Sequence, residues 1–361
     1  MKILFPILLT SATIFAAVRD SQPVHVTPGK INEAEQKQIT PMAGPHVEHG
    51  IDAFITGDFL YWTARMDGLG YITTGVGNGI SSTGKGSVKY PDWQWAPGFK
   101  AGIGLNLPHD GWDIFAKYTW LHSSSSNSHR FSDSGVVPNW NIANIFSFPQ
   151  DINAINHAKV DGDIHFSSID VSLGRNFFIS KFLILRPFIG FKGGWIDTDY
   201  HVHYEINSDS ITSDLRMKND QNYWGIGLRS GLETAWHLTP VWSIYGDFAL
   251  SALWSQFEIT RTDSRNDSRN PGGQGNPPLN TSVTQFNSED SFHTMKGALE
   301  FSLGLRGEWW FFENRYHFLI QGGWEEQLWL NMNNLIKTYF IQSNHGDLIL
   351  QGLTIKARFD F

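Results

Sequence analysis

The last ten residues of the chain, G-L-T-I-K-A-R-F-D-F (352–361), alternate between apolar and polar side chains. Counting back from Phe361, every second residue is apolar, and the intervening positions hold Thr354, Lys356, Arg358 and Asp360. Successive side chains of a β-strand point to opposite faces. The chain therefore ends in a predicted strand with one apolar and one charged face, whereas termini exposed to water usually fray.

The same alternation recurs in a series of longer segments. It is clear in 93–107, 112–120, 183–195, 224–238, 242–254 and 295–309, and weaker in 53–66, 164–178 and 316–330. Between Phe166 and Ile169 the apolar positions shift face, which predicts a β-bulge. In 53–66 aromatic residues fall on both faces, so its faces stay unassigned. With the terminal segment, about ten strands of 10 to 18 residues are predicted, or twelve if 198–221 holds another hairpin.

The predicted connections alternate in length. Short ones fall near 108–111, 179–182, 239–241 and 310–315; long polar ones fall near 67–92, 123–162, 198–221, 259–292 and 331–346. In lipid every backbone polar group needs a partner, so a sheet must close on itself. The pattern predicts an all-β fold, an antiparallel transmembrane barrel with short periplasmic turns, long extracellular loops and both termini in the periplasm. A soluble sandwich or barrel also alternates, but its outward polar face is usually rich in Lys, Glu and Thr.

Composition agrees with a membrane barrel and excludes some functions. Charged residues make up 17% of the chain, below the roughly 25% of soluble domains, and aromatic residues make up 14%. Many of the 15 Trp fall near predicted strand ends, where the interfacial girdles of a barrel lie. The net charge of −8 without a basic cluster argues against nucleic-acid binding. The absence of Cys excludes disulfides, thiol catalysis and Cys-ligated zinc.

The N-terminus has the layout of a secretory signal peptide. Lys2 precedes a short apolar stretch with small residues at its end, and a polar segment follows. The stretch is too short to span a membrane comfortably, since a span takes about 20 residues. We predict a signal peptide over 1–17, a polar periplasmic arm over 18–50 and an outer-membrane barrel over 51–361.

Strand parity predicts which charged residues face the barrel interior. The predicted pore-lining set is Lys100, Lys117, Arg186, Lys192, Arg229, Glu233, Asp247, Lys296, Glu300, Arg306, Glu308, Lys356 and Arg358, and further inward acids are Asp113, Asp170 and Asp360. The two signs nearly balance. About ten strands make a narrow barrel, because wide channels need 16–18 strands. The charged rows therefore either line a narrow water channel or pair across the interior and plug it.

Other candidate sites are weak. His201, His203 and Glu205 share one predicted strand face and could hold a metal, but we read them as solvated surface residues and predict no metal site and no cofactor. Several His and Asp lie near loop roots, namely His122, His129, His157, His165, Asp133, Asp161 and Asp163. No catalytic constellation stands out among them, so no enzyme is expected. The segment W-N-I-A-N-I-F-S-F (140–148) is apolar for a loop, and we expect it to fold into the barrel mouth.

Four stretches resemble the Legionella-type pore-forming outer-membrane proteins, a family akin to the chlamydial major outer-membrane proteins. They are F-I-T-G-D-F-L-Y-W-T-A-R-M-D-G-L-G-Y (54–71), W-A-P-G-F-K-A-G-I-G-L-N-L-P-H-D-G-W-D-I-F-A-K-Y-T-W-L-H (95–122), G-G-W-E-E-Q-L-W-L-N-M-N-N (322–334) and the terminal ten residues. Cysteine-rich members form disulfide-linked envelopes, a role that this Cys-free chain does not share.

The resemblance implies a porin-like channel in the Gram-negative outer membrane, for passive diffusion of small hydrophilic solutes and ions. It also implies that Phe361 and Phe359 are part of the C-terminal signal read by the barrel-assembly machinery. The expected partners are outer-membrane lipid, that machinery and small solutes, with a homo-oligomer possible. Two alternatives stay open: a closed barrel that acts as an adhesin or structural surface protein, and an enzyme with its site at the extracellular rim.

Overall fold

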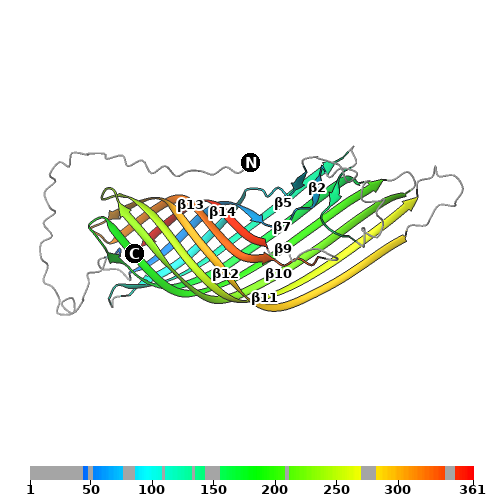
Figure 1. Ribbon diagram of the computed structural model, residues 1–361. Coiled ribbons are helices and arrows are strands. Elements are labelled where there is room, and N and C mark those ends of the chain that lie inside the picture. The colour runs from blue at the N-terminus through cyan, green and yellow to red at the C-terminus, as the bar shows by residue number, and fades with distance from the viewer. Residues whose placement is uncertain are drawn as a thin grey trace. The chain divides into compact units, whose positions relative to one another are not determined.

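Ten long antiparallel strands form a closed ring in the described part of this computed structural model (Figure 1). The structure describes residues 44–47, 52–75, 86–107, 110–131, 135–142, 155–207, 211–269, 282–337 and 346–361. Each long strand pairs with the long strands before and after it, and β1 (Ala53–Met66) closes the ring against β14 (Gly346–Asp360). The predicted antiparallel barrel of about ten strands is confirmed.

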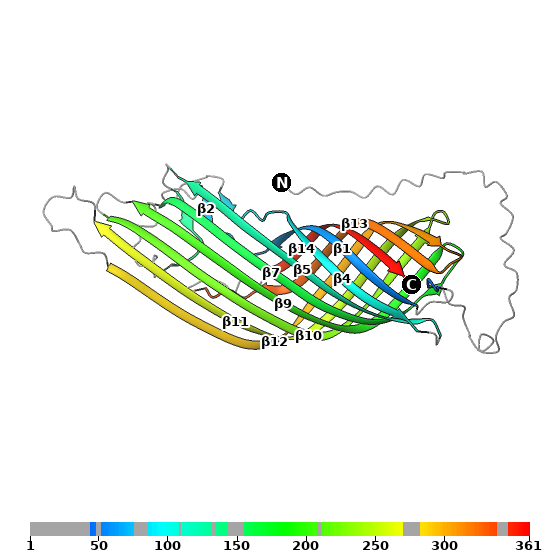
Figure 2. The same ribbon diagram turned by 180° about the vertical axis from the view of Figure 1, so that it is seen from behind.

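The remaining ring strands follow in chain order around the barrel. They are β4 (Ala96–Asn106), β5 (Trp112–Arg130), β7 (Ile155–Arg175), β9 (Leu183–Asn207), β10 (Ile211–His237), β11 (Trp242–Arg269), β12 (Ser282–Phe311) and β13 (Tyr316–Asn333). Short connections join strands at one end, which we call the turn end. There Ala53 and Phe361 exchange two backbone hydrogen bonds, and Figure 2 shows β1 between β14 and β4.

Short strands complete the described structure at both ends of the barrel. At the opposite end, which we call the loop end, β2 (Ile72–Thr74), β3 (Ser87–Lys89) and β6 (Val137–Pro138) form a small separate sheet. At the turn end, β8 (Phe177–Phe178) pairs with the start of β9. The tight turn 312–315 holds Phe312, Glu313 and Asn314 at positive φ, which keeps the connection between β12 and β13 short.

Near the turn end the ring has apolar side chains outside and polar side chains inside. On β10, for example, Leu228 and Trp236 face outward and are each 59% exposed, while Arg229 and Glu233 face the interior. Trp224 and Trp236 bracket this apolar band. The strand rises roughly 40 Å between them, or about 28 Å along the barrel axis at a tilt of about 45°. That height matches the hydrocarbon layer of a membrane.

Beyond the Trp residues at the loop-side edge of the band, such as Trp195 and Trp224, the polarity of the two faces of the wall is reversed. Past Trp195 on β9, the outward side chains become Asp197, Asp199, His201, His203 and Glu205, and the inward ones become Ile196, Tyr200, Val202, Tyr204 and Ile206, which are fully buried. Strands β7, β10 and β11 also have buried apolar side chains inside at this level, for example Val160, Met217 and Phe257, whereas β5 becomes polar outward but keeps Ser123 and Ser125 inside. We call this part of the wall the outer extension; it comprises 121–130, 155–166, 196–207, 211–223 and 255–269.

The inversion corrects three expectations about the strands. They reach 30 residues in β12, far beyond the predicted 18, because the polar stretches predicted as long loops continue as strand. Region 198–221 adds no strand to the ring; it lengthens β9 and β10, which pair without a break from Thr212 to Trp236. The predicted bulge between Phe166 and Ile169 is wrong, because β7 keeps its register there with both neighbours. Phe166 simply points into an apolar interior.

The predicted signal peptide lies outside the described residues, and only 44–47 of the predicted arm are described. The side-chain amide of Asn106 donates to the carbonyl of Pro45 at 3.2 Å, and His46 contacts the carboxylate of Asp52. This short piece therefore packs against the turn end of the barrel. No helix among the described residues is long and apolar enough to cross a membrane.

Candidate functional site: the barrel interior

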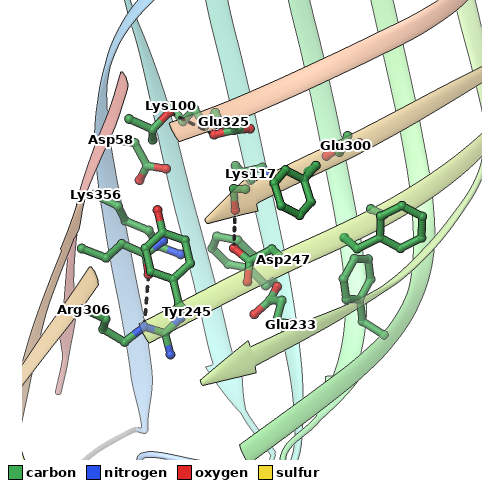
Figure 3. A pocket seen from close by; sticks show the side chains of 18 of the residues that line it. Asp58, Lys100, Lys117, Glu233, Tyr245, Asp247, Glu300, Arg306, Glu325 and Lys356 are labelled. Carbon is green, nitrogen blue, oxygen red and sulfur yellow. Dashed lines mark hydrogen bonds and ion pairs between the residues drawn. The ribbon is translucent and has the colours of Figure 1, made fainter. Parts of the chain in front are cut away.

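Charged side chains from most ring strands converge on one layer of the interior (Figure 3). They surround a cavity of about 70 Å³ whose charged lining residues are Asp58, Lys100, Lys117, Arg229, Glu233, Asp247, Glu300, Arg306, Glu325 and Lys356. One water needs about 10–15 Å³ of such space, so the cavity has room for a small cluster of waters. The layer is therefore polar and narrow rather than an open channel.

Ion pairs link neighbouring strands and also cross the interior between strands that are not neighbours. The ammonium of Lys192 on β9 lies 2.8 Å from Asp170 on β7 and 3.0 Å from Glu300 on β12. Glu300 also accepts from Arg229 at 2.8 Å. On the other side of the layer, Lys100 of β4 pairs with Glu325 of β13. Because opposite charges in this layer satisfy one another, they bind the strands together and fill the lumen.

A second group of charges lies between this layer and the turn end. Arg186 donates to Glu233 at 2.9 Å and contacts Asp113 on β5. His317 and Arg358 both bind the buried carboxylate of Asp360, His317 at 2.8 Å. Arg358 also stacks on an inward aromatic ring of β1. The terminal strand is thus fixed to its neighbours by buried polar contacts as well as by its backbone.

A few polar groups in the layer keep free hydrogen-bonding capacity. One carboxylate oxygen of Asp58 and one of Asp247 have no partner among the described residues. Lys356 lies in register with Asp58 across β1 and β14, and its ammonium sits 5.6 Å from the ring of Phe115. These groups face the cavity, where water or a small polar solute would complete their hydrogen bonds.

Toward the loop end the interior becomes an apolar core. Trp329 on β13 lies at its centre, with Phe166 and Tyr223 packed edge-on against its ring at 5.6 and 6.2 Å. Trp62 is also fully buried, and its indole donates to Thr354 at 3.0 Å. Gly194 lies directly under Trp329, where a Cβ atom would approach the indole to 2.8 Å.

Three loop segments are inserted above this core; together we call them the plug. They are 67–75, 135–142 and 334–337. Trp140 packs on Tyr200 of β9 at 5.3 Å, and the buried Arg261 of β11 donates to the carbonyls of Asn141 and Ile336 at 2.5 and 2.9 Å. One buried side chain therefore holds two of the three segments. The expectation that 140–148 enters the mouth agrees with Trp140 and Ile142, which are buried, while 143–148 lie outside the described residues.

Burial shifts the pKa values of two ionisable groups in the plug. The pKa of Tyr71 rises to about 12 because its phenol is withdrawn from water. The pKa of Lys337 falls to about 8 for the same reason, since burial disfavours the charged ammonium. The Lys337 ammonium lies over the ring of Trp140 at 4.9 Å.

All of the predicted pore-lining residues point into the barrel, although not all line the cavity. Lys296 lies nearer the loop end, where it bonds the carbonyl of Asn331, and Glu308 lies toward the turn end within 4.0 Å of Arg306. Parity missed Asp58 and Glu325, because aromatic residues on both faces of 53–66 hid the first and the alternation of 316–330 is weak around the second. That these residues line a conducting pore stays a prediction.

The two C-terminal aromatic residues lie on the outer surface. Phe359 stacks on Tyr316 at 5.7 Å and on Phe361 at 6.2 Å, near the turn end. They therefore lie among the exposed aromatic residues at the turn end, which include Trp310 and Phe312. Their predicted role in barrel assembly stays a prediction.

Histidine and acidic residues pair on the outer face of the outer extension. His122 lies 3.2 Å from Asp163, His203 lies 3.1 Å from Asp214, and His201 lies 3.6 Å from Asp220. These pairs line a convex wall rather than the cavity described above. The expectation that the protein is not an enzyme therefore stays a prediction.

A family of outer-membrane proteins matches most of this chain. The family model described as Legionella pneumophila major outer membrane protein precursor matches residues 45–361. Among solved structures, the Escherichia coli outer membrane protease OmpT has 11% identity and a TM-score of 0.38, covering 86% of this chain and 96% of its own. A Pseudomonas aeruginosa FadL homologue has 7% identity and a TM-score of 0.21, covering 86% and 89%. The search of curated proteins finds no match.

Proposed function

Because the chain belongs to the Legionella pneumophila major outer membrane protein family, we propose that this outer-membrane β-barrel is a narrow, weakly selective porin whose external mouth is closed by the plug. The solutes would be small, hydrophilic molecules and ions that diffuse passively. The observation that carries the proposal is the polar cavity at mid-barrel, which is lined by balanced charges and lies below an inserted plug.

The chemistry of the two interior regions supports a gate rather than a permanent seal. Buried ion pairs in the cavity layer offer polar partners to a passing solute, and rows of both signs favour weak selectivity. The plug consists of short loop segments that no ring strand contains. Local opening of such segments costs less than global unfolding, because they share few backbone hydrogen bonds with the barrel wall.

Conductance through planar bilayers tests the proposal. The wild-type protein should give small, infrequent ohmic steps, and deletion of Asn139–Phe148 should raise the conductance or the open time. Arg261→Ala is the milder variant, since it removes the anchor of two plug segments without shortening the chain. Arg216→Ala, on the exposed outer face, is the matched control and should conduct like the wild type. A heat-modifiable gel shift shows that each variant has folded.

A second candidate is a closed barrel that acts as an adhesin or structural surface protein. The ion pairs that fill the interior favour it, because Lys192 and its carboxylate partners leave little free space. Silence from the folded deletion variant and from Arg261→Ala would reject the porin and leave this candidate. We also propose three kinds of partner. They are outer-membrane lipid, the assembly machinery, which would recognise Phe361 and Phe359, and a second copy of the chain in a homo-oligomer.

A further inference from the structure

The outer extension brings two histidines and a glutamate together on its outward face. His157 of β7 pairs in register with Glu205 of β9, and His203 lies two residues before Glu205 on the same face. One potential ligand atom from each residue lies within 4.8 Å of the other two. The Nδ1 atom of His157 is 3.4 Å from Oε1 of Glu205. Two ligands of a tetrahedral zinc ion are about 3.4 Å apart when their bonds are 2.0–2.2 Å long.

Partners on the flanking strands orient both imidazoles. On one side, Ser128 of β5 lies 2.9 Å from Nε2 of His157. On the other side, Asp214 of β10 lies 3.1 Å from Nε2 of His203. A carboxylate can only accept, so Nε2 of His203 carries the proton and Nδ1 keeps its lone pair. A carboxylate or hydroxyl on the second nitrogen is the usual support for a metal-bound histidine.

We propose that His157, His203 and Glu205 form a binding site for one Zn²⁺ ion on the outer face of the extension. Two imidazole nitrogens and one carboxylate oxygen suit a borderline-soft dication, whereas Ca²⁺ and Mg²⁺ prefer oxygen ligands throughout. Three protein ligands leave one position for water or for a ligand from the medium. The ion would join β7 to β9, while Ser128 and Asp214 act as positioning residues.

The site lies well outside the membrane band. His203 follows Trp195 by eight residues along β9, which corresponds to roughly 20 Å along the barrel axis. The three side chains are partly exposed, His157 by 17%, His203 by 23% and Glu205 by 45%. Lys159 is in register with His203, but its ammonium is bound to Asp161 at 2.7 Å, in the next row toward the membrane. A metal ion in the medium can therefore reach the site.

The same residues contain a serine, histidine and acid in the order of a hydrolase triad. Such a triad needs backbone N–H donors that stabilise an oxyanion. The N–H of Ser128 already donates to the side-chain oxygen of Asn127 at 2.8 Å. A metal site therefore fits these residues better than a hydrolase triad does, and the experiment below distinguishes the two.

The test uses the full-length protein, folded in detergent and stripped of metal with EDTA. Equilibrium dialysis against Zn²⁺ followed by metal analysis should find one ion per chain, with no competition from equal Ca²⁺ or Mg²⁺. Co²⁺ should give the intense visible bands of a tetrahedral site. His157→Ala and His203→Ala should each weaken Zn²⁺ binding at least about tenfold, and Asp214→Asn about tenfold.

His201→Ala is the matched control, because His201 lies on the same strand face two residues from His203 but beside Asp220. It should bind Zn²⁺ like the wild type, and the gel shift confirms that each variant is folded. Absence of binding by the wild type would overturn the proposal, as would equal losses in His201→Ala and His203→Ala. Labelling of Ser128 by a fluorophosphonate in protein that binds no zinc would replace the metal site by a hydrolase.

Discussion

The side chain of Lys192 lies in a fully buried position at mid-barrel. Its side chain is shielded from solvent, and among the described residues Asp170, Glu300 and the ring of Trp329 at 5.5 Å surround the ammonium. Coulomb attraction in such surroundings has to offset a desolvation cost of several kcal/mol for each ion. The ion pair is therefore a weak source of net stability, although the loss of one partner is costly.

Lys192→Met should destabilise the barrel by about 3–5 kcal/mol, because it leaves Asp170 and Glu300 facing each other with one cation fewer. The measurement is the free energy of urea unfolding from lipid vesicles. Lys218→Met is the control, since Lys218 pairs with Asp220 on the outer face and its side chain is 58% exposed. That change should stay within about 0.5 kcal/mol. Equal effects would show that the interior charges are hydrated rather than buried.

Strand β10 shows at the scale of one element what the sequence could predict. Its turn-side part, from Trp224 to Trp236, follows the outer-membrane rule, and parity assigned its inward Arg229 and Glu233 correctly. Its loop-side part has polar residues outside and Leu215, Met217 and Tyr223 inside. A reading that places every apolar face outward takes this part for a loop. Parity also cannot show that Lys192 on β9 contacts Glu300 on β12, beyond β10 and β11, because that contact depends on how tightly the ring closes.

The plug segment 334–337 should respond to pH through Lys337. Burial holds the pKa of Lys337 at about 8, against 10.5 in an opened plug. Between pH 8 and 10.5 the open form binds one proton more than the closed form. The free energy that favours the closed plug therefore increases as the pH rises from 8, and it is smallest below pH 8. Tyr71 sets the upper limit of the window, because its raised pKa of about 12 makes closure weaken above pH 10.

The open probability in planar bilayers should therefore fall as the pH is raised from 7 to 9.5. Lys337→Met should remove this dependence and favour the closed state at pH 7, because an apolar side chain in the same place has no charge to desolvate. Lys218→Met, whose side chain lies on the outward face and pairs with Asp220, should keep the wild-type pH profile. A wild-type profile that does not change over this range would contradict the role of Lys337.

At the scale of the barrel, the two polarity patterns divide one continuous sheet into a membrane band and an outer extension. The backbone ladder runs through both without interruption, as the pairing of β9 with β10 shows. The difference lies only in which face of each strand is apolar. The outward apolar side chains over about 12 residues per strand therefore determine which part of the barrel lies in the membrane. The outer extension is instead stabilised by its apolar interior, as a soluble protein is.

A charge placed on the outer face should report where the membrane band ends. Leu228→Arg puts a guanidinium inside the band and should cost about 2–4 kcal/mol of folding free energy in vesicles. Asn222→Arg lies on the same face of the same strand, beyond Trp224, and should cost no more than about 1 kcal/mol because its side chain reaches the headgroups. In detergent-free urea titrations the two variants should therefore separate clearly. Similar costs at both positions would mean that hydrocarbon reaches past Trp224, and the outer extension would then have to begin further along β10.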